Sequence, residues 1–315
     1  MTFEFDPEVA ATLTALAAAG PAPIPPARGD WKTQREQGNE TMATIASMSP
    51  PLPSVTITEL TIPVAEGVEV AARWCTRADS APGSAVVYAH GGGMICGFIA
   101  AYDGIVSSYV EASGVPFLSV EYRLAPEVHG TTLADDTYAP LRWLQNNAEQ
   151  YGVDPARVAV MGDSAGGGVA AGVAVLARDH GTPLARQILV YPMLDDRNTE
   201  PDENMVPFAN WTYDNNYTGW HALLGDDIGT DKVSPVAAPA RLKDFTGMAP
   251  AFIDVGELDI FRDESILFAR NLTLAGTSVE LHVRSGAPHG FDLFTAGGQL
   301  GTRATADRVR ILQTL

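Results

Sequence analysis

Cysteine, positive charge and long apolar runs are all scarce in this chain. Its 315 residues include only two cysteines, Cys75 and Cys96, so a disulfide framework is not expected to hold the fold together. No apolar run is long enough to span a bilayer, and the acidic start of the chain lacks the basic region of a signal peptide. We therefore expect a cytoplasmic protein without a membrane segment.

Acidic residues outnumber basic residues by 38 to 20, which gives a formal net charge of −18. A surface with this charge repels nucleic acid and anionic membranes, so neither is an expected partner. The sequence also lacks a Gly-x-x-x-x-Gly-Lys-Ser/Thr phosphate loop, a His-Glu-x-x-His motif and a cysteine cluster. We expect no metal and no cofactor.

What the chain does have is a regular alternation of short β-branched runs with helical stretches. Strands are expected at residues 56–63, 68–74, 85–89, 115–120, 158–161, 187–191, 251–255 and 279–284. Helices are expected at residues 7–19, 131–151, 165–180, 263–275 and 303–315. This alternation predicts an α/β fold with a mostly parallel, eight-stranded sheet flanked by helices on both faces. The first two strands form a hairpin and add an antiparallel edge.

Two segments do not follow this alternation. Residues 1–50 combine an Ala/Leu-rich stretch with the proline-rich residues 21–26, and we interpret them as an arm or part of a lid. Residues 195–247 contain aromatic and turn-forming residues but no clear strand, although they lie between two strands of the sheet. A long insertion at such a place is often a functional lid, and the alternative is a surface excursion packed on the core.

The most informative local pattern is Gly162-Asp163-Ser164-Ala165-Gly166-Gly167. It lies between an apolar run and a small-residue stretch typical of a helix packed on a sheet. A serine flanked by glycines on a strand-to-helix turn is a nucleophile elbow. Small neighbours permit the tight turn, which raises the hydroxyl beside the free N–H groups of a helix N-terminus. The sequence therefore predicts Ser164 as a nucleophile.

A serine hydroxyl needs an adjacent base, which is normally a histidine oriented by a carboxylate. In this architecture the acid and then the histidine follow the serine along the chain. Of the six histidines, His289 lies in a Gly/Pro-rich loop after the last predicted strand, where active-site loops of such sheets gather. The loop after residues 251–255 offers Glu257 and Asp259, and we favour Asp259, although spacing alone does not separate the two.

A glycine run, His90-Gly91-Gly92-Gly93, directly follows the predicted strand 85–89. Glycine lets the backbone approach a substrate closely, and backbone N–H groups stabilise the negative charge of a tetrahedral intermediate. We predict an oxyanion hole formed by the N–H groups of Gly91, Gly92, Gly93 and Ala165. A triple glycine alone is also compatible with a simple flexible turn, and His90 is expected to be structural.

These motifs together resemble the hormone-sensitive-lipase-like bacterial carboxylesterases, also called family IV, of the α/β-hydrolase fold. The similarity extends over almost the whole chain and includes residues 122–127, 191–192, 262–264 and 289–291. The resemblance implies Ser164 as nucleophile, His289 as base and Asp259 as the carboxylate that orients it. It also implies a helical cap over the sheet and a possible homodimer formed through an exposed sheet edge.

The resemblance further implies how the chain is divided. Residues 1–50 are expected to form an N-terminal arm that is part of the cap, and residues 195–247 the cap insertion. Residues 51–194 and 248–315 are expected to form the α/β-hydrolase catalytic domain.

The sequence departs from the family pattern at a few positions. Met94 stands where an aromatic residue often follows the glycine run, Gly168 replaces the usual Asn after the elbow, and Ile260-Phe261 replaces Pro-Leu after the acid. Residues 128–131 lack the expected prolines. None of these changes removes a catalytic group, but the first and the last, at Met94 and residues 128–131, touch the pocket rim and leave the substrate preference open. The candidates for lining a substrate pocket are Met94, Phe208, Trp211 and Trp220.

We therefore predict a serine carboxylesterase that hydrolyses short- to medium-chain carboxylic esters through an acyl-enzyme, with a small-molecule ester as its partner. The ester preference rests on the resemblance, because the same triad serves an amidase, a peptidase or a carbamate hydrolase. A third alternative is a binding module, since plant hormone receptors use this fold after losing the catalytic histidine. The presence of His289 argues against that alternative.

Overall fold

A single eight-stranded sheet forms the centre of the protein. The computed structural model describes residues 3–20, 24–80 and 83–315. The sheet has the strand order β1-β2-β4-β3-β5-β6-β7-β8. β1 pairs antiparallel with β2 and β2 with β4, whereas every other pair is parallel. The strands are β1 (Val55–Ala65), β2 (Val68–Arg77), β3 (Gly83–Ala89), β4 (Phe117–Val120), β5 (Val153–Asp163), β6 (Gln187–Val190), β7 (Ala251–Gly256) and β8 (Val279–Arg284).

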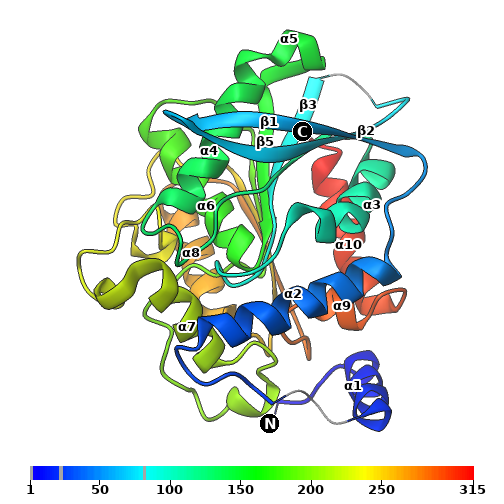
Figure 1. Cartoon of the computed structure of the whole chain (residues 1–315), viewed down its shortest axis with the longest axis vertical. Helices are drawn as coiled ribbons and strands as arrows, with labels where there is room; N and C mark the ends of the chain where they lie inside the picture. The colour runs from blue at the N-terminus through cyan, green and yellow to red at the C-terminus, as the bar shows by residue number, and fades with distance from the viewer. Residues whose placement is uncertain (1–2, 21–23, 81–82) are drawn as a thin grey trace.

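Helices cover both faces of this sheet, which confirms the predicted α/β class (Figure 1). One face carries α4 (Thr132–Asn146), α6 (Ala165–Asp179) and α8 (Arg262–Leu274), and the other carries α3 (Asp103–Ser113) and α10 (Gln299–Leu312). Side chains of β3 alternate between the two cores: Val87 packs in the α4/α6 core, and Val86 and Tyr88 pack in the α3/α10 core. Because both faces are buried, the parallel strands are continuous apolar runs.

The segments outside the strand-helix alternation also contain helices. α1 (Pro7–Ala19) matches the expected Ala/Leu helix. A helical cap was also expected, but the sequence pattern did not locate the helices α2 (Trp31–Met48) and α7 (Tyr213–Leu224). α2 is mostly polar and fully buries only Gln34. The apolar residues that it packs on the cores, Trp31, Met42 and Ala46, are few and only partly buried, so its apolar stripe is too weak to reveal its periodicity. Its start is fixed by Asp30, whose carboxylate accepts a hydrogen bond from the N–H of Thr33.

The remaining elements are short. The helix expected at residues 131–151 is interrupted at Asn147, so α5 (Ala148–Tyr151) follows α4 separately, and α9 (Phe291–Phe294) precedes α10. The short 3₁₀ turns are η1 (Ile99–Tyr102), η2 (Val206–Phe208), η3 (Gly225–Asp227) and η4 (Pro239–Arg241). Within the described part of the chain, no helix is both long and apolar enough to cross a membrane.

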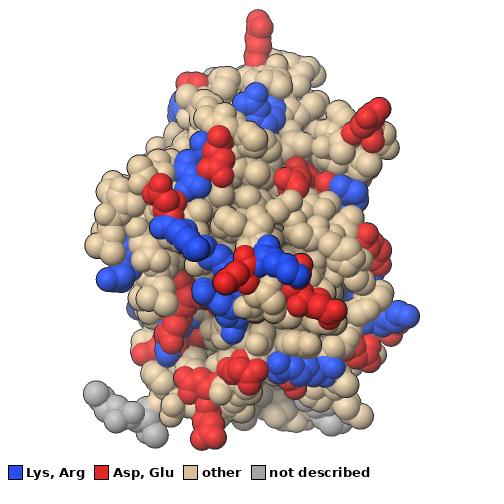
Figure 2. Space-filling view, turned by 90° about the vertical axis from the view of Figure 1, so that its left-hand side faces the viewer, with Lys and Arg blue, Asp and Glu red and all other residues tan. Residues whose placement is uncertain are grey.

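Charged side chains of both signs are interspersed on the face shown in Figure 2, although the net charge is strongly negative. Other charged groups are buried. Asp254 on β7 is completely buried and accepts hydrogen bonds from Arg284 at 2.7 Å and from Arg308 at 3.0 Å. This network joins β7, β8 and α10.

We predict that Asp254→Ala destabilises the protein by about 3–5 kcal/mol, because it leaves the buried Arg308 without one of its carboxylate partners. Urea unfolding at neutral pH measures the loss. The control is Glu59→Ala, which breaks an ion pair with Arg73 at a mostly exposed carboxylate and is expected to cost less than about 1 kcal/mol. Equal losses for the two variants would contradict the assigned importance of the buried network.

Candidate active site

Ser164 lies at a strained turn between β5 and α6. Its φ is +55°, a left-handed conformation that a residue other than glycine rarely adopts. The glycines around it are required by close backbone contacts. A β-carbon on Gly162 would lie 2.2 Å from the carbonyl oxygen of Gly166, and one on Gly166 would lie 2.1 Å from that of Ala89. The turn therefore fits against the end of β3 only with glycine at both positions.

The structure brings Ser164, His289 and Asp259 together. The Nε2 atom of His289 lies 2.9 Å from the hydroxyl oxygen of Ser164, and its Nδ1 atom lies 2.7 Å from a carboxylate oxygen of Asp259. The carboxylate only accepts, so Nδ1 carries the proton and Nε2 is free to accept the serine proton. The three residues follow β5, β7 and β8, so they meet because the carboxyl ends of parallel strands share one edge.

Asp259 is buried and held by its own loop. Its second carboxylate oxygen accepts a hydrogen bond from the N–H of Phe261 at 2.9 Å. The alternative acid, Glu257, has a different place: its carboxylate accepts from the hydroxyl of Ser285 at 3.0 Å and from the N–H of Gly286 at 2.9 Å. Glu257 thus shapes the loop that carries His289, whereas Asp259 contacts the imidazole.

The imidazole of His289 is enclosed by aromatic rings. Phe261 and Tyr191 contact it edge-on, with ring centroids 5.0 and 4.9 Å away, and the centroid of Trp211 is 6.4 Å away. The side chain of Asn210 donates a hydrogen bond of 2.7 Å to the carbonyl of His289. Because Asn210 and Trp211 belong to the segment 195–247, that segment helps to hold the histidine loop.

The glycine run lies beside the elbow, but its N–H groups are not equivalent. The N–H of Gly91 donates to the hydroxyl of Tyr102 at 3.0 Å and to Asp163 at 3.1 Å, so it is already occupied. In the described residues, the N–H groups of Gly92, Gly93 and Ala165 donate to no protein acceptor. This arrangement differs from the expectation that all three glycines serve an oxyanion, because the fixed carboxylate of Asp163 takes the Gly91 N–H.

Gly92 and Gly93 adopt conformations that favour glycine. Gly92 has a φ of +129°, and a β-carbon there would lie 2.0 Å from the carbonyl oxygen of Cys96. Gly93 has a φ of +58°, and its β-carbon would lie 2.3 Å from the ring of Trp211. The loop can therefore take this shape only without side chains at these positions.

Asp163, the residue before the serine, connects the elbow to the glycine run, and sequence reasoning assigned it no role. Its carboxylate also accepts hydrogen bonds from the hydroxyls of Tyr88 at 2.7 Å and Tyr102 at 3.0 Å. Burial raises the pKa of Asp163 to about 6, and the two tyrosine hydrogen bonds act in the opposite direction. Its position in the Gly-Asp-Ser motif was the only available signal.

His90 has the structural role that the sequence predicted. Its ring stacks on Tyr122 with centroids 4.4 Å apart, and Nδ1 donates to the carbonyl of Gly91 at 2.7 Å. The hydroxyl of Tyr122 donates to the carbonyl of His90 at 2.6 Å. The Nε2 atom is buried without a hydrogen-bond partner in the described residues. Burial therefore lowers the pKa of His90 to about 4.

The four predicted pocket residues lie in different surroundings. Trp211 lies beside both Gly93 and His289. Met94 and Trp220 are 2% and 0% exposed, so neither presents a surface to a substrate in this structure. Phe208 packs edge-on against Phe5, with ring centroids 5.1 Å apart. Aromatic character in an insertion does not distinguish a ring that faces a site from one that anchors the insertion.

The polar helix α2 is bound to the segment that follows the glycine run. Arg35 donates to the carbonyls of Ile95 and Ala125 and forms a two-pronged ion pair with Glu127. One turn further along, the side-chain oxygen of Asn39 accepts from the N–H of Gly97 at 2.9 Å. These contacts fix one end of the loop on which the predicted oxyanion hole depends.

One cluster in the described residues has the spacing of metal ligands, but it lies away from the serine. Glu280, His282 and Asp307 lie close together on β8 and α10. Arg310 donates to Glu280, and Arg284 donates to Asp307 at 2.8 Å. The carboxylates are therefore neutralised by arginine, and the cluster is an ion-pair network.

A serine, a histidine and a carboxylate in one hydrogen-bonded chain at the carboxyl edge of a parallel sheet define the class of α/β serine hydrolases. A family model described as the alpha/beta hydrolase fold matches residues 86–293. The chain therefore belongs to the α/β hydrolase fold family.

Similarity to known relatives and solved structures indicates which members of this fold family the chain resembles. It is similar to carboxylesterase NlhH of Mycobacterium tuberculosis, with 39% identity over 210 residues that cover 65% of this chain and 66% of that protein. It is also similar to carboxylic ester hydrolase LipN of the same species, with 34% identity over 80% of this chain and 69% of that protein. The structure of a bacterial heroin esterase has a TM-score of 0.87 and 34% identity, and the match covers 98% of this chain and 97% of that chain.

The chain thus spans about two thirds of the length of the two curated relatives and nearly all of the solved structure. These similarities confirm the expected relationship to the hormone-sensitive-lipase-like bacterial carboxylesterases.

We predict that His90 contributes a loss of stability in acid. The pKa of His90 is lowered in the folded state, so as pH falls from about 6.5 to 4 only the unfolded chain takes up a proton there. The stability that is present above pH 6.5 is lost over this range, by about 3 kcal/mol from this group. Urea unfolding at pH 7 and pH 4 should show a smaller acid loss for His90→Gln than for wild type.

The matched control is His129→Gln at an exposed histidine, which should show the same change in stability between pH 7 and pH 4 as wild type. An identical acid loss in wild type and His90→Gln would show that the buried imidazole does not cause it.

Proposed function

We propose that the protein is a serine carboxylesterase that hydrolyses short- to medium-chain esters of small molecules. The single observation that carries this proposal is the continuous hydrogen-bonded chain from Ser164 through His289 to the buried Asp259, with distances of 2.9 and 2.7 Å. The ester class is supported by the names of the relatives, which are carboxylesterases and carboxylic ester hydrolases.

The reaction follows from the positions of these groups. The Ser164 hydroxyl attacks the ester carbonyl while Nε2 of His289 takes its proton, and Asp259 stabilises the imidazolium that forms. The negative charge on the tetrahedral oxygen is stabilised by unoccupied N–H groups, for which Gly92, Gly93 and Ala165 are the candidates. His289 then gives its proton to the leaving alcohol. In the second half of the reaction it activates a water molecule, which releases the acid and restores Ser164.

A short to medium acyl chain is supported by the enclosure of the site. Ser164 is only 8% exposed, and the ring of Trp211 lies directly against Gly93. Such a site accepts small esters more readily than long acyl chains, and an amide or carbamate substrate has no observation of its own in its favour.

We also propose that residues 1–50 and 195–247 form a cap over a catalytic domain of residues 51–194 and 248–315. Contacts between the two cap segments support this division. The side chain of Gln34 on α2 donates to the carbonyl of Asn215 at 3.1 Å, and the N–H of Gly29 donates to the hydroxyl of Thr218 at 2.9 Å. Figure 1 shows α2 and α7 side by side at the end of the sheet where β5 runs into α6.

We also propose a homodimer formed through the sheet edge. β8 is one of the two edge strands of the sheet, and Val283 on it is 41% exposed. Leu267 and Leu274 on the neighbouring α8 are exposed as well. An edge strand with apolar surface beside it is the part of the molecule most suited to pairing with a second copy.

We predict that Ser164→Ala lowers kcat for a short p-nitrophenyl ester by about 10⁴-fold or more, because the covalent intermediate can no longer form. A fluorophosphonate probe should label wild type and not this variant. Ser54→Ala, at an exposed serine, is the control and should retain both activity and labelling. Turnover that survives in Ser164→Ala would contradict the proposed nucleophile.

The same assay across acyl lengths, with a matched amide, tests the substrate class. The rate should fall for long acyl chains and be much lower for the amide. Labelling at Ser164 together with a preference for the amide would support the triad and contradict the ester assignment.

We predict that Arg35→Ala lowers kcat by about tenfold, because it leaves the carbonyls of Ile95 and Ala125 without their donor and loosens the adjacent glycine run. Lys32→Ala, at an exposed position of the same helix, should leave kcat unchanged. Steady-state kinetics of both variants, with circular dichroism to verify folding, make the comparison. An unchanged kcat in folded Arg35→Ala would show that α2 does not support the catalytic loop.

A further inference from the structure

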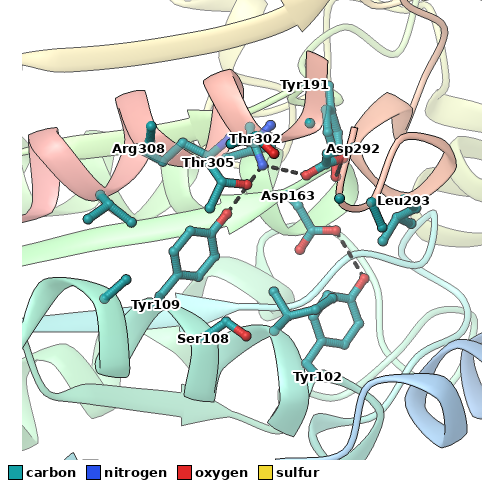
Figure 3. A pocket seen from close by; sticks show the side chains of 18 of the residues that line it. Tyr102, Ser108, Tyr109, Asp163, Tyr191, Asp292, Leu293, Thr302, Thr305 and Arg308 are labelled. Carbon is teal, nitrogen blue, oxygen red and sulfur yellow. Dashed lines mark hydrogen bonds and ion pairs between the residues drawn. The ribbon is translucent and has the colours of Figure 1, made fainter. Parts of the chain in front are cut away.

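A cleft with a volume of about 550 Å³ opens between α3 and α10, on the face of the sheet opposite α6 (Figure 3). Its mouth is formed by exposed residues of both sides, among them Ser108, Leu293 and Ala306. Asp163, a residue that is only partly buried, lies at its floor. The cleft therefore reaches the residue next to Ser164 from the face of the sheet opposite α6. Neither Ser164 nor His289 lines it.

The Asp163 carboxylate at this floor has only neutral partners. One oxygen, Oδ1, accepts from Tyr88 and from the N–H of Gly91, and the other, Oδ2, accepts from Tyr102. In the described residues, no lysine or arginine forms an ion pair with Asp163. A carboxylate offers about four acceptor positions, so one on Oδ2 remains. The raised pKa of Asp163, about 6, agrees with a carboxylate that lacks a cation and is ionised near neutral pH.

The second carboxylate of the cleft is already neutralised. Asp292 pairs with Arg308 at 2.5 Å and accepts from the hydroxyl of Tyr191 at 3.0 Å. Arg308 also pairs with Asp254 at 2.9 Å. The side chains drawn in Figure 3 thus leave an excess of negative charge at Asp163, which disfavours an anionic ligand.

Four tyrosine rings line the cleft around these charges: Tyr88, Tyr102, Tyr109 and Tyr191. An ammonium group is attracted both to the face of an aromatic ring and to a carboxylate. The rest of the wall is largely apolar and includes Ile105, Leu293 and Val309. The cleft therefore combines an acceptor for a cation at its floor with apolar walls above it.

We propose that the α3/α10 cleft is a second binding site, separate from the catalytic serine, for a small protonated primary amine with an apolar body. The ammonium group donates a hydrogen bond to the open position on Oδ2 of Asp163 and lies among the tyrosine rings. The apolar body packs between α3 and α10. This site goes beyond ester hydrolysis, and its existence does not depend on the ester assignment.

A bound amine affects the catalytic loop through the Asp163 carboxylate. The same Asp163 carboxylate holds the N–H of Gly91, which opens the glycine run, and Asp163 is bonded directly to Ser164. A cation at Oδ2 draws charge from the carboxylate and weakens its hold on that N–H. The bound amine therefore changes kcat as well as occupying the cleft.

The test is calorimetric titration of the whole protein with 2-phenylethylamine, 2-phenylethanol and 3-phenylpropanoate at pH 7.5. These probes share an apolar body and differ in charge. The amine should bind about tenfold more tightly than the alcohol or better, because its hydrogen bond to Asp163 is charge-assisted, and the anion should bind least. Equal affinities for amine and alcohol would overturn the proposal.

Variants locate the binding. Ala306→Trp, at the exposed mouth of the cleft, should weaken amine binding at least tenfold and leave ester turnover without amine unchanged. Leu274→Trp, an exposed position on α8 across the sheet, is the matched control and should bind as wild type does. Asp163→Asn should remove the preference for the amine over the alcohol. Undiminished amine binding in Ala306→Trp would place the amine elsewhere and refute the site.

Discussion

The contact between the nucleophile turn and the end of β3 is the constraint on which the rest of the site depends. Gly166 comes so close to the carbonyl of Ala89 that no side chain fits between them. The same closeness places the start of α6 beside the glycine run that follows β3. The hydroxyl and the unoccupied backbone N–H groups are thus brought together by one backbone contact, and side chains such as Asp163 then hold the glycine run in position.

Parallel pairing extends this arrangement to the other two residues of the triad. β5, β6, β7 and β8 run in one direction, so the loops that carry Ser164, Asp259 and His289 open at one edge. The sheet brings them near one another, and local hydrogen bonds fix their final positions. Glu257 holds the loop before His289, and Asn210 holds the carbonyl of His289 from the side of the insertion.

The sequence predicted those parts of the molecule that have a strong local pattern. The strands alternate with helices at recognisable periods, and the elbow, the glycine run and the histidine loop carry their own motifs. The choice between Asp259 and Glu257 depended on the direction of each side chain, which spacing does not encode. The helix α2 has only a weak apolar stripe, and much of its binding is through polar contacts such as that of Arg35. The Gly91 N–H was misjudged because its acceptor, Asp163, lies 72 residues away along the chain.

The charged form of Asp163 lowers the stability of the folded protein. Its pKa is raised above the value in an unfolded chain, so its contribution to stability is complete in acid and is lost as pH rises through about 6. Above that pH the charged carboxylate lowers the free energy of unfolding by about 3 kcal/mol relative to an unperturbed group. A neutral side chain would avoid this loss, but it could not accept from Tyr88, Tyr102 and the Gly91 N–H together. Asp163 therefore lowers the stability of the protein, but it holds the glycine loop in one position beside the serine.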